Sequence, residues 1–396
     1  MRIGMILDKT FPPDPRVENE AVSLLNAGHK VFLFCLGYGN FHVEEIIEGT
    51  EIRRYKSNKL EYKLSALAYT FPFYTDIMKS KIKHFLTNNS IEAIHIHDIR
   101  IADAVFKAND KLNLPIVLDL HDNMPEVMQF YPHLQKFPGK YLISPQKWKQ
   151  KEEEFIQKAT KIVTVSNEFK KEVIGRTKID NSKIVVVPNT VRKNFYQKFT
   201  LKNDILERYK NSYVILYIGD TGLRRGLQTA IEATTKLKDK IPNLKLVIVG
   251  KNTTDYVLKQ QVKKLNLYEF VDLEGWQSMG SFPSYIMASS VCISPLHRNI
   301  QHDVAYANKL FQYMSLGKPV LVSNATAQKN LIEKVNSGLV HEDRNDKDFA
   351  AKVLKLYTNR DFAKELGENG KKFIENEFYW EKTSLKLINL YNNLAR

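Results

Sequence analysis

The sequence predicts an α/β protein made of two doubly wound domains that face a central cleft. The chain has 396 residues, more than one ordinary hydrophobic core organises. Short β-branched runs alternate with longer amphipathic stretches, as in βαβ units on a parallel sheet. This alternation stops at a polar stretch near the middle and then starts again, which indicates two sheets. Such sheets bind ligands at the carboxyl ends of their strands.

The first series of runs predicts the strands of an N-terminal domain. They are "RIGMIL" (2–7), "KVFLFCL" (30–36), "EAIHIH" (92–97), "PIVLDL" (115–120), "KIVTVS" (161–166) and "KIVVVPN" (183–189). Amphipathic stretches between them, such as 17–27 and 101–111, predict the crossover helices. We place this acceptor-side domain at residues 1–195.

The second series predicts the strands of a C-terminal domain over residues 205–378. They are "YVILYIG" (213–219), "LKLVIVG" (244–250), "FVDLEG" (270–275), "VCISPL" (291–296) and "KPVLVS" (318–323). The polar stretch 190–210 between the two series is the expected linker. Apolar residues at helical spacing in 379–396 predict a last helix that packs back on the N-terminal domain.

Charge and hydropathy restrict the partners of the chain. The formal net charge is +15, which favours an anionic partner such as phosphate, nucleic acid or a lipid surface. No recognition helix or aromatic platform is recognisable, so we expect no nucleic acid. No apolar run approaches the roughly 18 residues that span a bilayer. We expect a cytoplasmic protein, at most peripheral on the inner membrane face.

A helix start that follows a strand predicts an anion site in the second domain. "ANKLFQYMSLGKPVLVS" (307–323) offers Asn308 as an N-cap, a helix over 309–316, and Gly317 and Pro319 to end it. The unpaired N–H groups of such a start favour phosphate. A capped helix start without a ligand is the alternative interpretation.

A basic loop elsewhere in the second domain is a second indication of a phosphate site. In "YIGDTGLRRGLQTAIEA" (217–233) a strand leads through a loop with Arg224, Arg225 and Gly226 into a helix. Glycine lets the backbone approach a ligand, and a guanidinium can bind a phosphate bidentately. The loop matches neither a Walker loop nor G-x-G-x-x-G, and an exposed basic loop is the alternative.

Several motifs, in this order and spacing, resemble those of family-4 retaining glycosyltransferases of the GT-B architecture. They are "FPPDPRVENEAVSLLNAGHKV" (11–31), "LDLHDNMPEV" (118–127), "IVTVSNEF" (162–169), "VVVPNTV" (185–191), "YIGDTGLRRGL" (217–227), "LVIVGKN" (246–252), "ANKLFQYMSLGKPV" (307–320) and "FYWEK" (378–382). The resemblance covers nearly the whole chain. It implies transfer of a sugar from a nucleotide donor, without a metal.

The resemblance also implies a donor site in the second domain. Asn308, Lys309 and Leu310 would present the helix start to the diphosphate of a nucleotide sugar, expected to be a UDP-sugar. Arg225, with Arg224 beside it, stands where the family has a phosphate-binding Lys, and Gly219 precedes the loop.

Three positions depart from the family pattern. Gln312 stands where the family has a Glu that receives the ribose hydroxyls, and Asp220 follows Gly219 where the family has Arg. A further family Glu falls on Val304, with Asp303 one place away. Loss of charge at position 312 should cost on the order of 1–2 kcal/mol, which weakens a site rather than removing it.

In the first domain, His121 and Asp122 follow the strand "PIVLDL" and Arg16 follows the first strand. The resemblance places His121 beside the reacting carbon of the donor sugar, where an imidazole could stabilise developing charge. We expect Asp122 and Arg16 to contact acceptor or phosphate; a solvated helix-start arginine is the alternative for Arg16.

"HIHD" (95–98) puts His95 and His97 on one strand face without a visible third ligand, so we expect no metal.

The stretch 56–84 suits an anionic membrane surface. It holds six Lys against two acidic residues, with Tyr69, Phe71, Phe73 and Tyr74 between basic flanks. A solvated basic helix with an aromatic core face is the alternative.

Together these observations predict a retaining hexosyltransferase that moves a sugar from a nucleotide-diphosphate donor to a glycan or lipid-linked acceptor in cell-surface polysaccharide assembly. The departures at 220, 304 and 312 leave a second hypothesis: a catalytically weak subunit that binds a nucleotide sugar or a partner glycosyltransferase.

Overall fold

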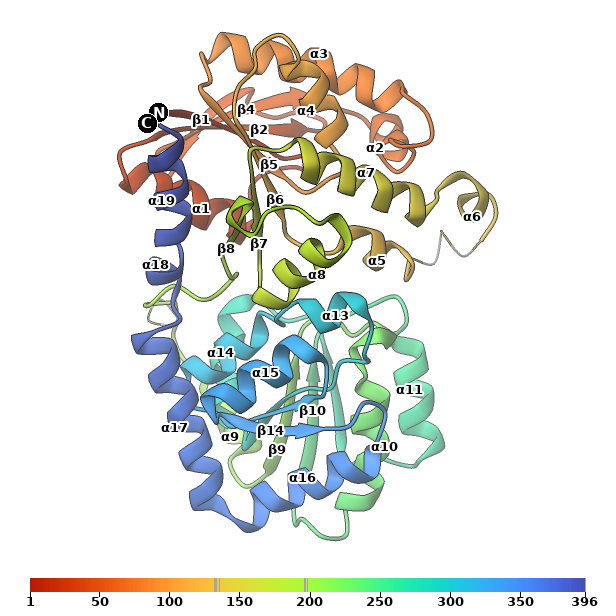
Figure 1. Ribbon diagram of the computed structural model, residues 1–396. Helices are drawn as coiled ribbons and strands as arrows, with labels where there is room; N and C mark the ends of the chain where they lie inside the picture. The colour runs from red at the N-terminus through yellow and green to blue at the C-terminus, as the bar shows by residue number, and fades with distance from the viewer. Residues whose placement is uncertain (132–133, 135, 196, 198, 396) are drawn as a thin grey trace. The chain divides into compact units, whose positions relative to one another are not determined.

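The computed structural model describes residues 1–131, 134, 136–195, 197 and 199–395 (Figure 1). The chain divides into two compact units: Met1–Asn189 together with Thr383–Arg396, and Thr190–Lys382. The expected linker region belongs to the second unit and includes a helix, α9 (Asn203–Tyr209). The first unit therefore ends at residue 189 and not at 195 as predicted, and the chain returns to it at residue 383 and not at 379.

The first unit is built on an eight-stranded sheet in the order β3-β4-β2-β1-β5-β6-β7-β8. All neighbours pair in parallel except β3 and β4. The strands are β1 (Arg2–Ile6), β2 (Lys30–Gly37), β3 (Glu44–Ile47), β4 (Thr50–Lys56), β5 (Ala93–His97), β6 (Ile116–Leu120), β7 (Lys161–Thr164) and β8 (Ile184–Val186). Strands β5 and β6 are buried on both faces, and the polar residues within them, His95, His97 and Asp119, are buried together with the apolar ones.

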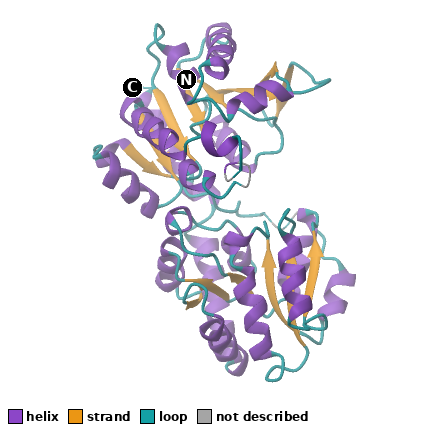
Figure 2. Cartoon of the chain, turned by 90° about the vertical axis from the view of Figure 1, so that its right-hand side faces the viewer, coloured by secondary structure: helices purple, strands orange, loops and turns teal. Residues whose placement is uncertain are grey.

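Helices cover this sheet (Figure 2). They are α1 (Pro15–Asn26), α2 (Lys59–Ser65), α3 (Phe73–Asn88), α4 (Ala102–Asn109), α5 (Met124–Met128), α6 (Gly139–Leu142), α7 (Pro145–Lys158) and α8 (Asn167–Thr177). The last helix, α19 (Leu385–Leu394), packs on α1 and β8 of the same unit. Its buried Tyr391 reaches His95 on β5, with 2.8 Å between the hydroxyl and Nδ1.

The second unit holds a fully parallel six-stranded sheet in the order β11-β10-β9-β12-β13-β14. Its strands are β9 (Tyr213–Ile218), β10 (Leu244–Val249), β11 (Val271–Gly275), β12 (Val291–Ser294), β13 (Val320–Ser323) and β14 (Gly338–His341). The order reverses at β9, which is the doubly wound arrangement and places ligand sites at the carboxyl ends of β9 and β12.

Helices lie on both faces of this second sheet, and a hydrophobic core cluster is buried on each face. Besides α9 they are α10 (Leu227–Leu237), α11 (Asp255–Lys264), α12 (Phe282–Ala288), α13 (Ile300–Val304), α14 (Lys309–Ser315), α15 (Thr326–Val335), α16 (Asp346–Thr358), α17 (Arg360–Asn376) and α18 (Trp380–Thr383).

The sequence reading missed three strands. β3 and β4 form an antiparallel pair whose exposed residues are largely charged, so the pair lacks the continuous apolar run that marked the other strands. β14, "GLVH", is only four residues long and only partly buried at the edge of its sheet. Edge strands need less apolar character because one side faces solvent.

Among the described residues, no helix combines the length and the apolar character that crossing a membrane requires.

Candidate active site

The loop that follows β9 brings its backbone close to the neighbouring strand end. Gly219 has φ +130°, and Gly250, which follows β10, lies so near that a Cβ there would meet the Gly219 carbonyl oxygen at 1.8 Å. Gly226 has φ +74°, and a Cβ there would meet the Pro295 carbonyl oxygen at 1.8 Å. Only glycine allows these approaches, so the loop is held tightly against the carboxyl ends of β10 and β12.

Arg225 is anchored within this loop by Asp220. The guanidinium Nε donates to Asp220 Oδ2 at 3.1 Å, and Asn252 Nδ2 donates to the other carboxylate oxygen at 2.6 Å. Burial opposes ionisation of Asp220, but these contacts lower its pKa. The Arg224 carbonyl accepts a hydrogen bond from the amide of His297, which ties the loop to the chain after β12.

Lys309 lies beside Gly219 as a cation without an acidic partner. Its Nζ sits 3.4 Å from the ring centroid of Tyr217, and would lie 3.1 Å from a Cβ at Gly219. In the part of the chain that the structure describes, no carboxylate forms an ion pair with it. Burial, followed by the charge of Arg225, holds the pKa of Lys309 well below the usual lysine value. An anion at this position would relieve that unfavourable charge.

The other residues predicted for this region have different surroundings. Asn308 is exposed and occupies the N-cap position of α14, but its side chain makes no capping hydrogen bond, contrary to our expectation. Its helical φ and ψ explain this, because a capping side chain needs an extended backbone. Leu310 is fully buried in the core, so only its backbone can serve a ligand. The Gln312 side chain is half-buried and has no hydrogen-bond partner among the described residues.

His121 lies at the carboxyl end of β6 in a group of titratable side chains. Its Nε2 is 2.7 Å from Asp119 Oδ2 and 3.1 Å from His97 Nδ1, and its Nδ1 is 3.8 Å from Asp98 Oδ2. Burial disfavours the imidazolium, but Asp119 and Asp98 outweigh it and raise the pKa of His121 to about 9. Asp122, the next residue, is exposed at the same edge.

Arg16 is not an exposed helix-start arginine. It is 4% exposed. Its Nε and Nη2 donate to the two oxygens of Asp119 at 3.0 and 2.8 Å, and Nη1 donates to the Val187 carbonyl at 3.2 Å. Glu20, one turn further along α1, lies 2.9 Å away. These contacts make Arg16 part of a buried ion-pair network, which contradicts the solvated-arginine alternative; a contact of Arg16 with acceptor or phosphate stays a prediction.

A family model described as glycosyltransferase family 4 matches residues 16–195, and one described as glycosyl transferases group 1 matches 199–373. The chain belongs to glycosyltransferase family 4.

Curated relatives of this glycosyltransferase are distant. The capsular polysaccharide biosynthesis glycosyltransferase CapM of Staphylococcus aureus is 25% identical over 60% of this chain and 63% of its own length. UDP-Gal:alpha-D-GlcNAc-diphosphoundecaprenol alpha-1,3-galactosyltransferase of Escherichia coli is 27% identical over 60% of this chain and 61% of its own length. The chain thus spans less than two thirds of either relative.

A solved structure shares the fold over the full length. Sucrose-phosphate synthase from Thermosynechococcus elongatus covers 100% of this chain and 99% of its own, with a TM-score of 0.80 and 17% identity. The glycosyltransferase therefore has the GT-B architecture of two Rossmann-like α/β domains.

Asp303 cannot substitute for the missing carboxylate at Val304 without giving up its present role. It accepts from Arg298 Nε and Nη2 and from the Thr326 amide, with distances of 2.8–3.1 Å. It therefore links α13 to the start of α15.

His95 and His97 belong to a buried cluster that the sequence did not reveal. With Glu20 and Asp119 they offer four ligand-type atoms within 4.8 Å of one another. However, the Arg16 guanidinium contacts both carboxylates and already supplies their positive charge. A dication would have to displace it, so we interpret the cluster as an ion-pair network. Absence of a metal from the reaction stays a prediction.

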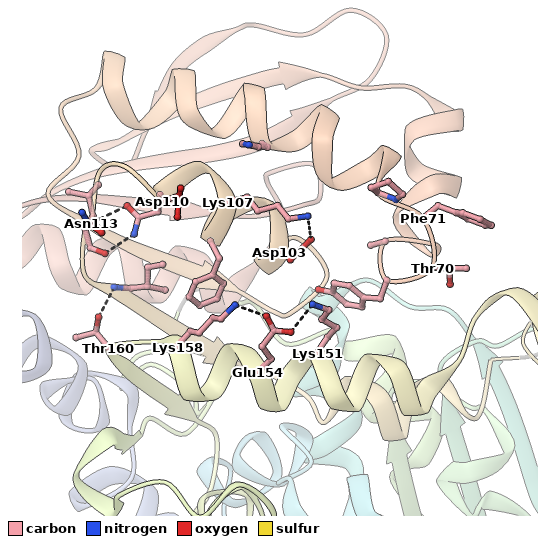
Figure 3. A pocket seen from close by; sticks show the side chains of 18 residues that line it. Thr70, Phe71, Asp103, Lys107, Asp110, Asn113, Lys151, Glu154, Lys158 and Thr160 are labelled. Carbon is pink, nitrogen blue, oxygen red and sulfur yellow. Dashed lines mark hydrogen bonds and ion pairs between the residues drawn. The ribbon is translucent and has the colours of Figure 1, made fainter.

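The first unit also contains a pocket of about 850 Å³ between α4, α7 and the loop before α3 (Figure 3). Ile116 at the start of β6 and Thr160 just before β7 line it, so it opens at the amino ends of these strands. Lys107 pairs with Asp103, and Lys151 and Lys158 pair with Glu154. The pocket is distant in the fold from His121, which lies at the opposite ends of the strands.

Two contacts of the site were missed by sequence reasoning. Tyr217 provides the ring under Lys309, although it reads as one more apolar residue of a strand. Asp119 binds both Arg16 and His121, and its only signal was an acidic residue within the apolar run "PIVLDL". A charge inside a buried strand requires a partner, so that residue could have been singled out.

Proposed function

We propose that this glycosyltransferase binds the diphosphate of a nucleotide sugar at Lys309, Arg225 and Arg224. The observation that carries the proposal is Lys309, a half-buried lysine whose ammonium group forms no ion pair with a carboxylate among the described residues and whose pKa is held well below the usual value by burial and by Arg225. Asp220 pairs with only one of the two arginines, so the cluster keeps a net positive charge, and a bound anion would favour the protonated form of Lys309. Gly219 allows close approach of the phosphates to the backbone.

The same cluster supports a reaction without a metal. Cations fixed by the protein can stabilise the negative charge that develops on the diphosphate as the sugar leaves. Gln312, with a free amide, would receive the ribose hydroxyls through one acceptor and one donor group. His121 would act at the reacting carbon, and the family resemblance favours retention of configuration there. Asn308, Leu310 and Asp122 complete the proposed set through backbone or exposed polar groups.

For the substrates we propose a UDP-sugar and a lipid-linked glycan acceptor, in assembly of a cell-surface polysaccharide. Two relatives support this: one is named for capsular polysaccharide biosynthesis, the other for UDP-galactose transfer to a diphosphoundecaprenol-linked sugar. The hypothesis of a catalytically weak binding subunit is not favoured, because the matching families and these relatives are glycosyltransferases.

A thermal-shift screen followed by transfer assays tests this function. Nucleotide sugars are screened first, since a ligand at a hundred times its Kd raises the free energy of unfolding by about 2.7 kcal/mol. Transfer from those that bind is then measured to a diphosphoundecaprenol-linked sugar, with and without EDTA, and the anomer formed is read by NMR. Stabilisation without turnover would revive the binding-subunit hypothesis. No stabilisation by any nucleotide sugar would contradict the donor site.

We also propose that residues 56–84 bind an anionic membrane surface. Of the four aromatic side chains at 69–74, Phe71 and Phe73 are 42% and 59% exposed, and their rings stack. Leu60 and Tyr62 on α2 are similarly exposed. Tyr69 and Tyr74 instead face the protein: the Tyr69 hydroxyl donates to the Ile99 carbonyl, and Tyr74 is buried. The aromatic surface is therefore smaller than the sequence suggested.

Exposed lysines surround these apolar residues. Lys63, Lys79 and Lys83 are exposed, whereas Lys81 is held by Glu61 and the Lys56 carbonyl, each at 2.8 Å. Each exposed Lys near an anionic surface contributes up to about 1 kcal/mol, and the attraction weakens as salt rises. Such binding would hold the enzyme reversibly near a lipid-linked acceptor on the cytoplasmic face.

Vesicle co-sedimentation tests the membrane proposal. We expect the triple variant with Lys63, Lys79 and Lys83 changed to Glu to sediment less than wild type on anionic vesicles at low salt. A control with Lys259, Lys263 and Lys264 changed to Glu, on α11 of the second unit, carries the same change of charge. Equal loss in both variants would indicate a general charge effect, and no sedimentation of wild type would favour the solvated-helix interpretation.

A further inference from the structure

We propose that Asp119 is a positioning residue for His121: its buried carboxylate holds Nε2 and thereby presents Nδ1 to the ligand. This inference rests on the proposed function, which places His121 at the reacting sugar. It adds a residue that is buried inside the sheet and reaches the ligand only through the imidazole.

The contact between the two side chains is short and shielded. Asp119 is fully buried, and its Oδ2 lies 2.7 Å from His121 Nε2. Only two residues separate them, but Asp119 is still within β6 while His121 follows its end. His121 Nδ1 lies 3.8 Å from Asp98 Oδ2, beyond hydrogen-bond distance, and the described residues make no shorter polar contact with it, so this nitrogen is open to a ligand oxygen.

Asp119 is itself fixed from two further elements. Arg16 on α1 donates two hydrogen bonds to its carboxylate, one to each oxygen. His95 on β5 lies 3.5 Å from Oδ2 and is in turn held by Tyr391 of α19 through its other ring nitrogen. A carboxylate with so many partners cannot rotate freely, so the imidazole that it binds takes one orientation.

The charges that face His121 come from every element around it. Asp119 of β6 and Asp98 after β5 favour the imidazolium, whereas Arg16 of α1 disfavours it. His97 of β5 is neutral, because burial and then the charges of His95 and His121 hold its pKa well below the usual value. His97 Nδ1 lies 3.1 Å from His121 Nε2, so a neutral His97 can only share with Asp119 the single proton that this nitrogen carries. With a pKa raised to about 9, His121 would be an imidazolium at neutral pH.

This arrangement determines what His121 can do. Both ring nitrogens of an imidazolium are donors, so Nδ1 would donate to an oxygen of the donor sugar or its leaving phosphate. A charged donor at a fixed position stabilises developing negative charge better than a rotating one. A general base at Nδ1 would require the neutral ring, which Asp119 opposes.

Histidine NMR tests the proposal without any activity measurement. Protein labelled with ¹⁵N and ¹³C in histidine is titrated, and His121→Gln identifies the resonance. We expect His121 in wild type to titrate near pH 9, and at a clearly lower pH in Asp119→Asn, where Asp98 alone opposes the effects of burial and Arg16. Asp98→Asn is the matched control, since it removes a nearby carboxylate and keeps the Nε2 contact; there we expect a smaller fall.

Kinetics supply the second readout. In Asp119→Asn we expect kcat to fall on the order of 10²-fold, with a much smaller change in donor KM, because a misoriented group lowers the rate and not the affinity. Should this variant fail to fold, the wild-type titration still decides. A wild-type His121 that titrates near 6.5, or equal effects of Asp119→Asn and Asp98→Asn, would overturn the proposal. Unchanged transfer in His121→Asn would instead remove the catalytic role of His121 and leave the titration result standing.

Discussion

At the scale of single residues, the basic side chains of the proposed donor site differ in whether a carboxylate pairs with them. Arg225 Nε donates a hydrogen bond to Asp220. Lys309 instead makes a cation–π contact with the Tyr217 ring and forms no ion pair with a carboxylate among the described residues. An arginine that is already oriented loses little freedom when it binds a phosphate. The negative residue that departs from the family pattern therefore positions the neighbouring guanidinium.

Replacing Arg225 by Ala should weaken binding of a UDP-sugar by about 1.5–3 kcal/mol, the usual contribution of a hydrogen bond to a charged group. Isothermal titration calorimetry with UDP-glucose, or with the donor found by screening, measures this. Arg360→Ala, at an exposed arginine on α17 of the same unit, should leave the affinity unchanged. Full affinity in Arg225→Ala would show that the diphosphate lies elsewhere.

Gln312→Glu should tighten nucleotide binding by up to roughly tenfold, because a carboxylate accepts from both ribose hydroxyls with charge assistance. The amide makes no hydrogen bond to another described residue, so the exchange breaks no existing contact. Titration with UDP gives the ratio of the two Kd values. A weaker complex would mean that the pocket is adapted to the amide, and the assignment of ribose to this position would be wrong.

At the scale of elements, the donor loop depends on close packing of backbone against backbone. The 3₁₀ turn Leu223–Arg225 ends at Gly226, whose left-handed conformation starts α10 and brings it against the Pro295 carbonyl. The amide of His297 then bonds to the Arg224 carbonyl. Three adjacent segments thus hold the two arginines in place.

Gly226→Ala should destabilise the second unit by roughly 1–3 kcal/mol through backbone strain alone, and a Cβ would also collide with Pro295. Urea unfolding measures the loss, and UDP affinity should fall with it because Arg224 and Arg225 must shift. Gly280→Ala serves as the control, since its Cβ would make only ordinary contact with Phe199 at 3.5 Å. Equal stability of the two variants would contradict the close approach at Gly226.

At the scale of the whole molecule, the pKa of His121 in the first unit and those of His302 and His341 in the second unit shift in opposite directions. His121 in the first unit is held charged by Asp119 and Asp98 against the effect of burial. In the second unit, burial dominates at His302 and His341 and lowers their pKa values to about 3 and about 4. His121 and His341 should therefore contribute to stability with opposite pH dependences.

The signs follow from linkage. His121 has a folded pKa of about 9 against an ordinary 6.5, so its contribution is complete below pH 6.5 and is lost as pH rises through 9. His341 stays neutral when folded, so below pH 6.5 the unfolded chain gains protons and stability is lost as pH falls towards 4. Each displacement, from 6.5 to about 9 or to about 4, is worth roughly 3 kcal/mol.

Urea unfolding at several pH values, with hydrogen exchange to resolve the units, measures both effects. The difference between wild type and His121→Gln should shrink from pH 6.5 to 9, and that between wild type and His341→Gln should shrink from pH 6.5 to 4. Differences that do not vary with pH would show that these histidines titrate normally in the folded protein.

The sequence by itself determined the architecture and the family. Runs such as "LKLVIVG" and "PIVLDL" report burial on both faces, and burial on both faces requires a parallel sheet covered by helices. The positions of Gly219 and His121 at strand ends, and of Gly226 at a helix start, followed from the same pattern. The edge strands β3 and β14, and β4 next to β3, escaped it because they are exposed or only partly buried.

Only the tertiary structure decided how the charged side chains are paired. Arg16 looked available to a ligand, yet it bonds to Asp119, 103 positions away, and His95 meets Tyr391, 296 positions away. Lys309 could have found a carboxylate and instead lies on Tyr217. Periodicity records which face of an element is buried, whereas an ion pair depends on register, rotamer and packing between elements that are distant in the chain.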